Sequence, residues 1–132
     1  MEWIGEQIAS ISSQKNTSIE IFISVDLSND KTYEWCQDLA RNNSYIKVLP
    51  YGERFGGAAK NFYRLIRDVD FSYFDYIALS DQDDIWDSDK LHHAISVIEK
   101  DNLDGYSGNV IAFWSDGQER LDKKNFPQKR FD

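Results

Sequence analysis

Helical and strand-like patterns alternate along this sequence, and that alternation limits the folds open to it. Four segments place apolar residues at helical spacing, and four others are short, apolar and rich in β-branched or aromatic residues. The expected helices cover residues 2–13, about 31–42, 58–68 and about 88–100, and the expected strands cover 19–26, 45–49, 74–80 and 106–114. Such an order predicts an α/β fold in which helices cover both faces of a mostly parallel sheet.

Polar or glycine residues follow three of the expected strands at their C-terminal ends. They are Asp26, the pair Gly56-Gly57 and the acidic stretch Asp81–Asp84. Parallel strands bring their C-terminal ends to one edge of the sheet, which is where open α/β sheets bind ligands. Glycines directly before a helix let the backbone approach an anion at the helix N-terminus, although a plain flexible turn is the alternative. The convergence predicts a ligand site at this edge.

Three carboxylates, Asp81, Asp83 and Asp84, lie within four residues. They repel one another unless a cation lies among them, and Mg²⁺ or Mn²⁺ prefers such oxygen ligands. An EF-hand loop is excluded, because its sixth and twelfth positions counted from Asp81 hold Trp86 and His92 instead of Gly and Glu. Two interpretations remain: a divalent-metal site, and a solvated acidic turn that caps the following helix. Trp86 is expected to be a packing anchor for this loop.

The composition excludes several classes of function. With 132 residues and 41% hydrophobic content, the chain can form one globular domain with a modest core. Its net charge of −8 argues against binding to nucleic acid or to anionic lipid, both of which attract basic surfaces. Cys36 is the sole cysteine, which indicates a reducing, cytoplasmic setting, and no apolar run reaches the length of a membrane span. Peripheral contact with the inner face of the membrane is compatible with this setting.

The stretch IALSDQDDIWDSDKL is very similar to the DQDD strand and helix of family 2 glycosyltransferases, which have the GT-A fold. Further stretches resemble the same family and, within it, the bacterial rhamnosyltransferase-like group: EWIGEQIASISSQ, ISVDLSND, RFGGAAKNF and SGNVIAFWSDGQ. The resemblance covers essentially all of residues 1–132. It implies a single partial glycosyltransferase domain, the Rossmann-like nucleotide-sugar-binding half. The highly charged segment over about 118–132 is expected to be a loop, an edge hairpin or a tail.

The resemblance also implies roles for individual residues. Asp83 would be a direct ligand of Mg²⁺ or Mn²⁺, and Asp81 would contact the ribose and the metal. Asp26 would hydrogen-bond the nucleotide base. The nucleotide-binding residues implied in all are Asp26, Arg54, Gly56, Gly57 and Asp81. The bound metal would stabilise charge on the departing diphosphate.

Two departures from the family pattern bear on these roles. Val25 and Leu27 stand where the family has Asp and Gly, so base recognition depends on Asp26. The family's first strand is expected before the first helix, and its acceptor-binding half, with the catalytic base, is expected beyond Asp132. We therefore expect a fragment or a degenerate gene product, truncated relative to the family, whose exposed sheet edges favour a homo-oligomer.

The expected function is that of a metal-dependent inverting glycosyltransferase in bacterial cell-surface polysaccharide synthesis. It would transfer a sugar from a dTDP- or UDP-sugar to the hydroxyl of a saccharide or lipid-linked acceptor, although residues 1–132 alone are expected to have little activity. Two alternatives remain open. One is a non-catalytic nucleotide- or carbohydrate-binding module or an inactive relic, which would bind nucleotide without turnover. The other is a generic acidic α/β domain whose carboxylates cap helices, in which metal would not affect stability.

Overall fold

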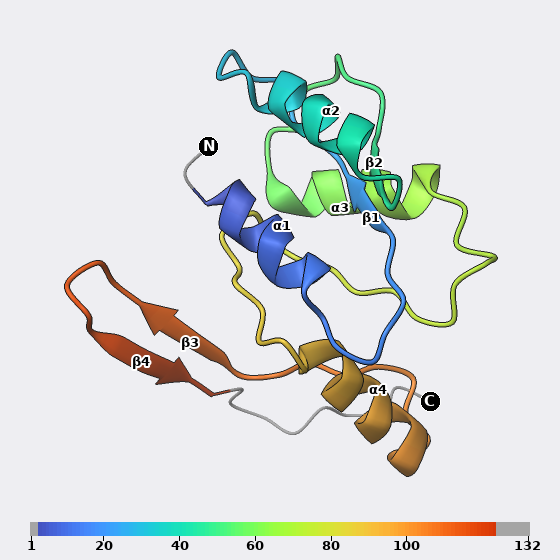
Figure 1. Cartoon of the computed structure of the whole chain (residues 1–132), viewed down its shortest axis with the longest axis vertical. Helices are drawn as coiled ribbons and strands as arrows, with labels where there is room; N and C mark the ends of the chain where they lie inside the picture. The colour runs from blue at the N-terminus through green and yellow to red at the C-terminus, as the bar shows by residue number, and fades with distance from the viewer. Residues whose placement is uncertain (1–2, 124–132) are drawn as a thin grey trace. The chain divides into compact units, whose positions relative to one another are not determined.

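Two compact units make up the chain, residues 1–91 and 92–132, and the computed structural model describes residues 3–123 of them (Figure 1). Each unit is described by itself. The elements in chain order are α1 (Ile4–Ser12), β1 (Ile21–Ile23), α2 (Thr32–Asn42), β2 (Ile46–Val48), α3 (Ala58–Asp68), α4 (Lys90–Asp101), β3 (Val110–Phe113) and β4 (Glu119–Asp122).

The core of the first unit forms between α1, α2 and a small parallel sheet. Strands β1 and β2 pair in parallel, with Ile21 opposite Ile46. Ile8 of α1 packs against both, and these three side chains are between 4% and 9% exposed. Isoleucines at helical spacing in α1 and at alternate positions in β1 therefore meet on one face of the sheet, as amphipathic patterning requires.

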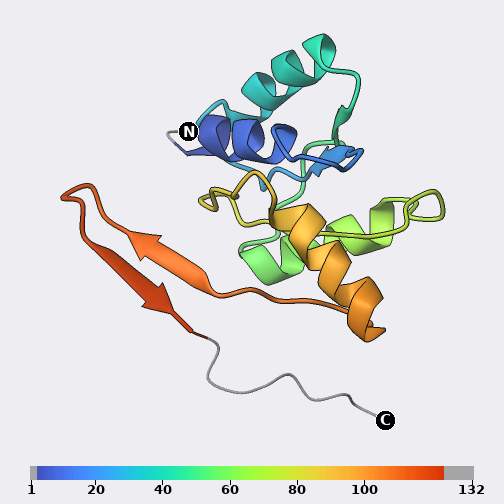
Figure 2. The same cartoon turned by 60° about the horizontal axis from the view of Figure 1, so that its bottom comes forward.

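The opposite face of the same sheet is covered by α3. Phe22 and Ser24, which alternate with the core isoleucines, point away from α1 and α2. The Ser24 hydroxyl donates a hydrogen bond to Asn61 Oδ1 of α3. Figure 2 shows α1 and α2 on one side of β1 and α3 on the other. Helices on both faces of a parallel sheet were expected, and this small sheet has them.

The expected strand over 74–80 does not form, and that prediction was wrong. The segment is extended, but no ladder of backbone hydrogen bonds joins it to a strand among residues 3–123. Its apolar side chains are not buried: Tyr76, Ile77 and Leu79 are 42%, 55% and 51% exposed. Composition alone marks the segment as strand-like, but a strand also requires a neighbour for its N–H and C=O groups. Phe74 makes a ring contact with β1, edge-to-face with Phe22 at 5.9 Å between centroids.

A β-hairpin dominates the second unit. Strands β3 and β4 pair antiparallel, with Val110 opposite Asp122, and Gly117 in the turn has a φ of 84°. Instead of one mostly parallel sheet, the described chain therefore contains one parallel and one antiparallel pair of strands. Part of the charged segment over 118–132, for which a loop, an edge hairpin or a tail was expected, forms β4 of this hairpin. Residues 124–132 lie outside the described residues. Among residues 3–123, no helix is long and apolar enough to cross a membrane.

Candidate functional site

Asp26 lies three residues beyond the end of β1, and its carboxylate organises the loop that precedes α3. One carboxylate oxygen accepts hydrogen bonds from the backbone N–H of Leu27 at 2.9 Å and of Phe55 at 2.7 Å. The other accepts the N–H of Gly56 at 2.8 Å. The bonds from Phe55 and Gly56 are the main cause of a pKa of Asp26 below the ordinary 3.8. The hydrogen bonds within the chain therefore already stabilise the charged form of Asp26.

The loop held in this way needs glycine at its end. Gly56 has a φ of 69°, in the left-handed region that residues other than glycine rarely adopt. The space around its Cα is open. Gly57 then occupies the N-cap position of α3, with no side-chain cap. Arg54 lies in the same loop and is exposed. Because glycine has no side chain, the N-cap residue provides no side-chain partner to the first N–H groups of α3. This is the arrangement that the two glycines before the helix predicted.

Two residues of α3 that sequence reasoning missed fix the position of the helix. Asn61 Nδ2 donates to the Ser24 carbonyl at 2.8 Å, and Arg64 Nη1 donates to the Ser24 hydroxyl at 3.1 Å. Arg64 also donates to the Pro50 carbonyl and lies 3.5 Å from the Asp68 carboxylate, although it is only 6% exposed. Their spacing of three residues on one helix face was the available signal. They tie α3 to the segments that follow β1 and β2.

The acidic loop forms a tight turn of its own. The backbone N–H of Asp84 donates to the Asp81 carbonyl at 3.3 Å, and the Asp81 N–H donates to the Asp84 carboxylate at 3.4 Å. Partial desolvation raises the pKa of Asp81 above 3.8, and the negative charges of Asp84 and Asp83 raise it further. The pKa of Asp81 is thus shifted in the opposite direction to that of Asp26. A positive charge at this turn would therefore relieve an unfavourable arrangement.

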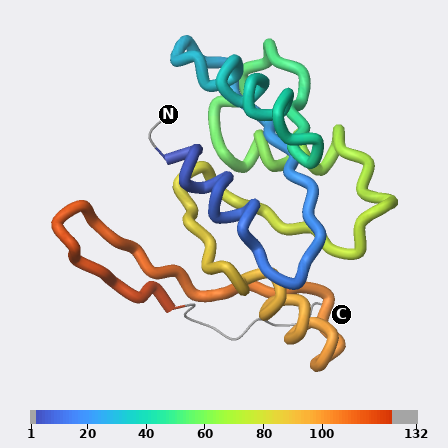
Figure 3. Tube along the Cα trace, in the orientation of Figure 1, coloured from blue at the N-terminus to red at the C-terminus, as the bar shows by residue number. Residues whose placement is uncertain are grey.

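Trp86 anchors the acidic loop, as expected. Its side chain is 6% exposed, and Lys90 Nζ lies 4.4 Å from the centre of the indole ring. The segment that carries it, in yellow in Figure 3, runs beside α1. The sequence-predicted site residues thus form two groups, one around Asp26 with the glycine loop and one around Asp81 with Asp83 and Asp84.

The donor set of the acidic loop fits Mg²⁺ or Mn²⁺ better than a metal that needs a protein cage. No group of three or more His, Cys, Asp or Glu side chains within residues 3–123 is arranged to enclose a metal ion. Mg²⁺ in nucleotide enzymes is held by one or two carboxylates, with water and substrate phosphates as the other ligands. The carboxylates of Asp81 and Asp83 are two such oxygen donors.

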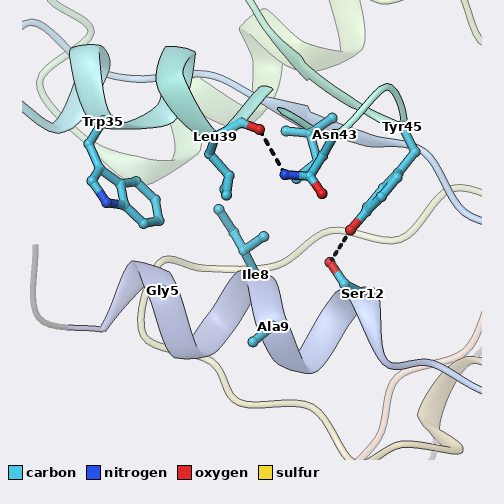
Figure 4. A pocket seen from close by; sticks show the side chains of 9 residues that line it. Gly5, Ile8, Ala9, Ser12, Trp35, Leu39, Asn43 and Tyr45 are labelled. Atoms are coloured by element: carbon cyan, nitrogen blue, oxygen red, sulfur yellow. Dashed lines mark hydrogen bonds between the residues drawn. The ribbon is translucent and has the colours of Figure 1, made fainter. Parts of the chain in front are cut away.

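A cavity of about 240 Å³ lies elsewhere in the first unit, between α1 and α2 (Figure 4). Its walls are largely apolar and include Ile8, Trp35 and Leu39. The polar groups at its rim are already paired, since the Tyr45 hydroxyl donates to Ser12 Oγ at 3.4 Å and Asn43 Nδ2 donates to the Leu39 carbonyl at 2.8 Å. None of the predicted site residues lines it, so we interpret it as imperfect packing between helices.

Comparison with known proteins identifies the family of this chain. The sequence profile described as glycosyl transferase family 2 matches residues 2–131. The chain belongs to this family. The family has the GT-A fold, and its members are transferases that generally use a divalent metal.

A curated relative is similar over nearly the whole chain. It is the dTDP-rhamnosyl transferase RfbG of Shigella flexneri, which is 49% identical over 131 residues, or 98% of this chain. Those residues make up 45% of the relative, so the chain spans just under half of that protein's length. No solved structure matches the chain. The resemblance to the rhamnosyltransferase-like group is therefore confirmed.

Proposed function

We propose that this chain is the nucleotide- and metal-binding half of an inverting glycosyltransferase that acts in the cytoplasm on bacterial cell-surface polysaccharide. The enzyme would transfer a sugar from a nucleotide diphosphate to the hydroxyl of a saccharide or lipid-linked acceptor. The observation that carries the proposal is the acidic loop, where Asp81, Asp83 and Asp84 lie in one turn, and where desolvation and the charges of Asp84 and Asp83 raise the pKa of Asp81. A ligand that contributes positive charge would stabilise this loop.

The chemistry of the donor set suggests how the work is divided. Asp83 and Asp81 would hold Mg²⁺ or Mn²⁺, which when bound stabilises charge on the departing diphosphate. Asp81 would also contact the ribose. Asp84, whose carboxylate already accepts the Asp81 N–H, would shape the turn. The acidic loop would thus bind the metal–diphosphate part of the donor.

The loop around Asp26 would bind the nucleoside part. A carboxylate offers about four acceptor positions, and hydrogen bonds from Leu27, Phe55 and Gly56 occupy three of them. The remaining position is available for the base. Gly56 and Gly57 would let the backbone pass close to the nucleotide, and the exposed Arg54 would reach base or phosphate.

The donor is proposed from the relative. RfbG is named as a dTDP-rhamnosyl transferase and shares 49% of its aligned residues with this chain. We therefore favour dTDP over UDP as the nucleotide and rhamnose as the sugar. The catalytic base is expected in the half of the family domain beyond Asp132, so these residues alone should bind donor and transfer little sugar.

Thermal unfolding with and without ligand tests the proposal. Mn²⁺ and dTDP at a hundredfold over the dissociation constant should add roughly 2.7 kcal/mol to the free energy of unfolding. Asp83→Ala should abolish this gain, whereas Asp75→Ala, an exposed carboxylate before the loop, should keep it. UDP in place of dTDP should stabilise less. If the wild-type chain shows no gain with either nucleotide, the proposed binding role is wrong.

The alternative, a nucleotide-binding module or inactive relic, makes the same binding prediction and differs in turnover. Joining this chain to the part of RfbG that it does not cover should give an active transferase if the nucleotide half is intact. Binding without any transfer in such a chimaera would favour the relic. Normal transfer by residues 1–132 alone would contradict the assignment of the base to the part of the family domain that these residues do not cover.

We also propose self-association through the extended segment at 74–80. Its backbone is not part of a sheet within residues 3–123, and Ile77 and Leu79 are about half exposed. An extended segment with exposed apolar side chains can pair, through its backbone, with the same segment of a second copy. Light scattering should show dimers at high concentration, and Ile77→Lys should return the chain to monomers. A wild-type monomer at the same concentration would contradict the idea.

A further inference from the structure

Helix α1 packs two stripes of side chains against the rest of its unit, and the second one is polar. The first contains Ile4, Ile8 and Ile11, which join the core with β1 and β2. The second contains Gln7, Ser10 and Gln14, which are spaced by three and four residues and extend from α1 to just past its end. Such spacing places side chains on one face of the helix. Gln7 and Gln14 are only 8% and 9% exposed, which is unusual for polar side chains without a ligand or a structural partner.

The polar stripe faces the acidic segment, and its first member contacts the start of that segment. Gln7 Nε2 donates to Ser80 Oγ at 2.9 Å and also donates to the Asp81 carbonyl. The contact is with the backbone of Asp81, so the carboxylate of this residue is left for other ligands. Gln7 therefore fixes the chain directly before Asp83 and Asp84.

The other two members hold the chain after the carboxylates. Ser10 Oγ accepts the backbone N–H of Trp86 at 3.0 Å. Gln14 is engaged at both ends of its amide: Nε2 donates to the Asp87 carbonyl at 2.6 Å, and Oε1 accepts the N–H of Leu91 at 2.9 Å. The contacts from α1 thus bracket Asp83 and Asp84 on both sides, and they satisfy backbone groups that a buried helix face would otherwise leave unpaired.

This bracket opposes the repulsion within the loop. The three carboxylates raise one another's energy when all are charged, and a free loop would open to separate them. The loop is held at Asp81 on one side of Asp83 and Asp84, and at Trp86, Asp87 and Leu91 on the other. It therefore cannot open without breaking partly buried hydrogen bonds. A binding site gains affinity when its donors are held in position before the ligand arrives.

We infer that Gln7, Ser10 and Gln14 are positioning residues, which hold the acidic loop in the conformation that receives the divalent cation and diphosphate. The inference rests on the proposed function, because it assigns these side chains to the same ligand. They act through the backbone of the loop and would not themselves touch the donor.

Amide hydrogen exchange in the ligand-free chain tests whether α1 holds the loop. Gln14→Ala should raise the exchange rates of the Leu91 and Trp86 amides by about tenfold, which corresponds to the loss of roughly one hydrogen bond. Ser10→Ala should do the same at Trp86, and Ser10→Thr, which keeps the hydroxyl, should restore protection. The control is Gln37→Ala on α2, where Gln37 Nε2 donates only to the Tyr33 hydroxyl in the contacts described for it. Unchanged exchange in Gln14→Ala and Ser10→Ala would overturn the inference.

Affinity for Mn²⁺ with dTDP, measured by calorimetry on the same variants, separates positioning from simple packing. Gln14→Ala and Ser10→Ala should weaken binding by about tenfold, and Ser10→Thr and Gln37→Ala should bind as the wild type does. Faster exchange with unchanged affinity would overturn the positioning role while leaving the proposed function intact. Absence of binding by the wild-type chain would instead contradict the proposed function, and with it this role.

Discussion

Asp26 and Asp81 each follow an extended apolar segment, yet their surroundings shift the pKa of the two carboxyl groups in opposite directions. Asp26 accepts hydrogen bonds from the backbone N–H groups of Leu27, Phe55 and Gly56, and its pKa is lowered. The pKa of Asp81 is raised by desolvation and by the charges of Asp84 and Asp83. One carboxylate already has its partners within the chain. The other has carboxylates of like charge as its neighbours.

The difference separates two kinds of acidic residue that look the same in the sequence. A carboxylate satisfied by backbone N–H groups organises a loop and contributes to stability without any ligand. A carboxylate among like charges lowers stability until a ligand arrives, which is common at functional sites. We therefore expect substitutions at Asp26 and at Asp81 to change the stability of the ligand-free chain in opposite directions.

The largest effect should come from Asp26→Asn. The neutral amide keeps one acceptor oxygen but presents an NH₂ group to N–H donors, so at least one charge-assisted hydrogen bond is lost. The thermal midpoint of the ligand-free chain should fall by several degrees. Asp30→Asn is an informative comparison, because Asp30 also accepts backbone and hydroxyl hydrogen bonds, from Thr32 and Ser28, and has a pKa of about 2. If Asp26→Asn leaves the midpoint unchanged, the carboxylate does not hold the glycine loop.

Gly56→Ala tests the residue that donates its N–H to the Asp26 carboxylate, and it should lower the stability by less than Asp26→Asn does. With φ at 69°, alanine at this position is strained by about 1 kcal/mol, even though the space around it is open. The matched control is Gly105→Ala, which is equally free of neighbours within 4 Å and does not have a φ in the left-handed region. Urea unfolding should show a loss for the first variant only. Equal stability of the two variants would mean that the loop relaxes without cost.

Local patterns explain which parts of the fold could be predicted from the sequence. Helix α3 begins and ends where its periodicity indicates, at Ala58 and Asp68, and α2 does so within one residue. These segments form because their hydrogen bonds are internal to the helix. The segment at 74–80 was mispredicted because a strand depends on a partner distant in sequence, and β1 is shorter than its apolar run for the same reason.

The candidate site shows the same limit. The sequence identified Asp26, Gly56 and Asp81 as polar or glycine residues after apolar segments, but not that Asp26 bonds to a loop 29 and 30 residues away. Such contacts depend on how α3 packs, which in turn depends on the buried Arg64. A charged side chain on a helix is normally taken as solvent-facing, so the spacing of Arg64 and Asn61 on one helix face was not enough to predict its burial.

Asp81→Asn should give the smallest change in the ligand-free chain and one of opposite sign. Removing a partly desolvated charge next to Asp83 and Asp84 should raise the thermal midpoint slightly at pH 7. The same variant should lose the stabilisation that Mn²⁺ and dTDP give the wild type. Asp75→Asn, outside the loop, controls for a general effect of making the net charge of −8 less negative. A lower midpoint for Asp81→Asn would show that Asp81 stabilises the loop without a ligand.

The pH dependence of these two variants is the finest test of the comparison. Because the pKa of Asp26 is lowered on folding, its stabilisation is present above 3.8 and is lost as pH falls through the lower folded value. Because the pKa of Asp81 is raised, its cost is absent below 3.8 and develops as pH rises through the higher folded value. Measured from pH 7 downward, the deficit of Asp26→Asn should therefore persist to a lower pH than the advantage of Asp81→Asn, which should disappear first. If both differences faded together, the two carboxylates would have the same folded pKa, and their surroundings would not differ in the way that distinguishes a structural carboxylate from a ligand-binding one.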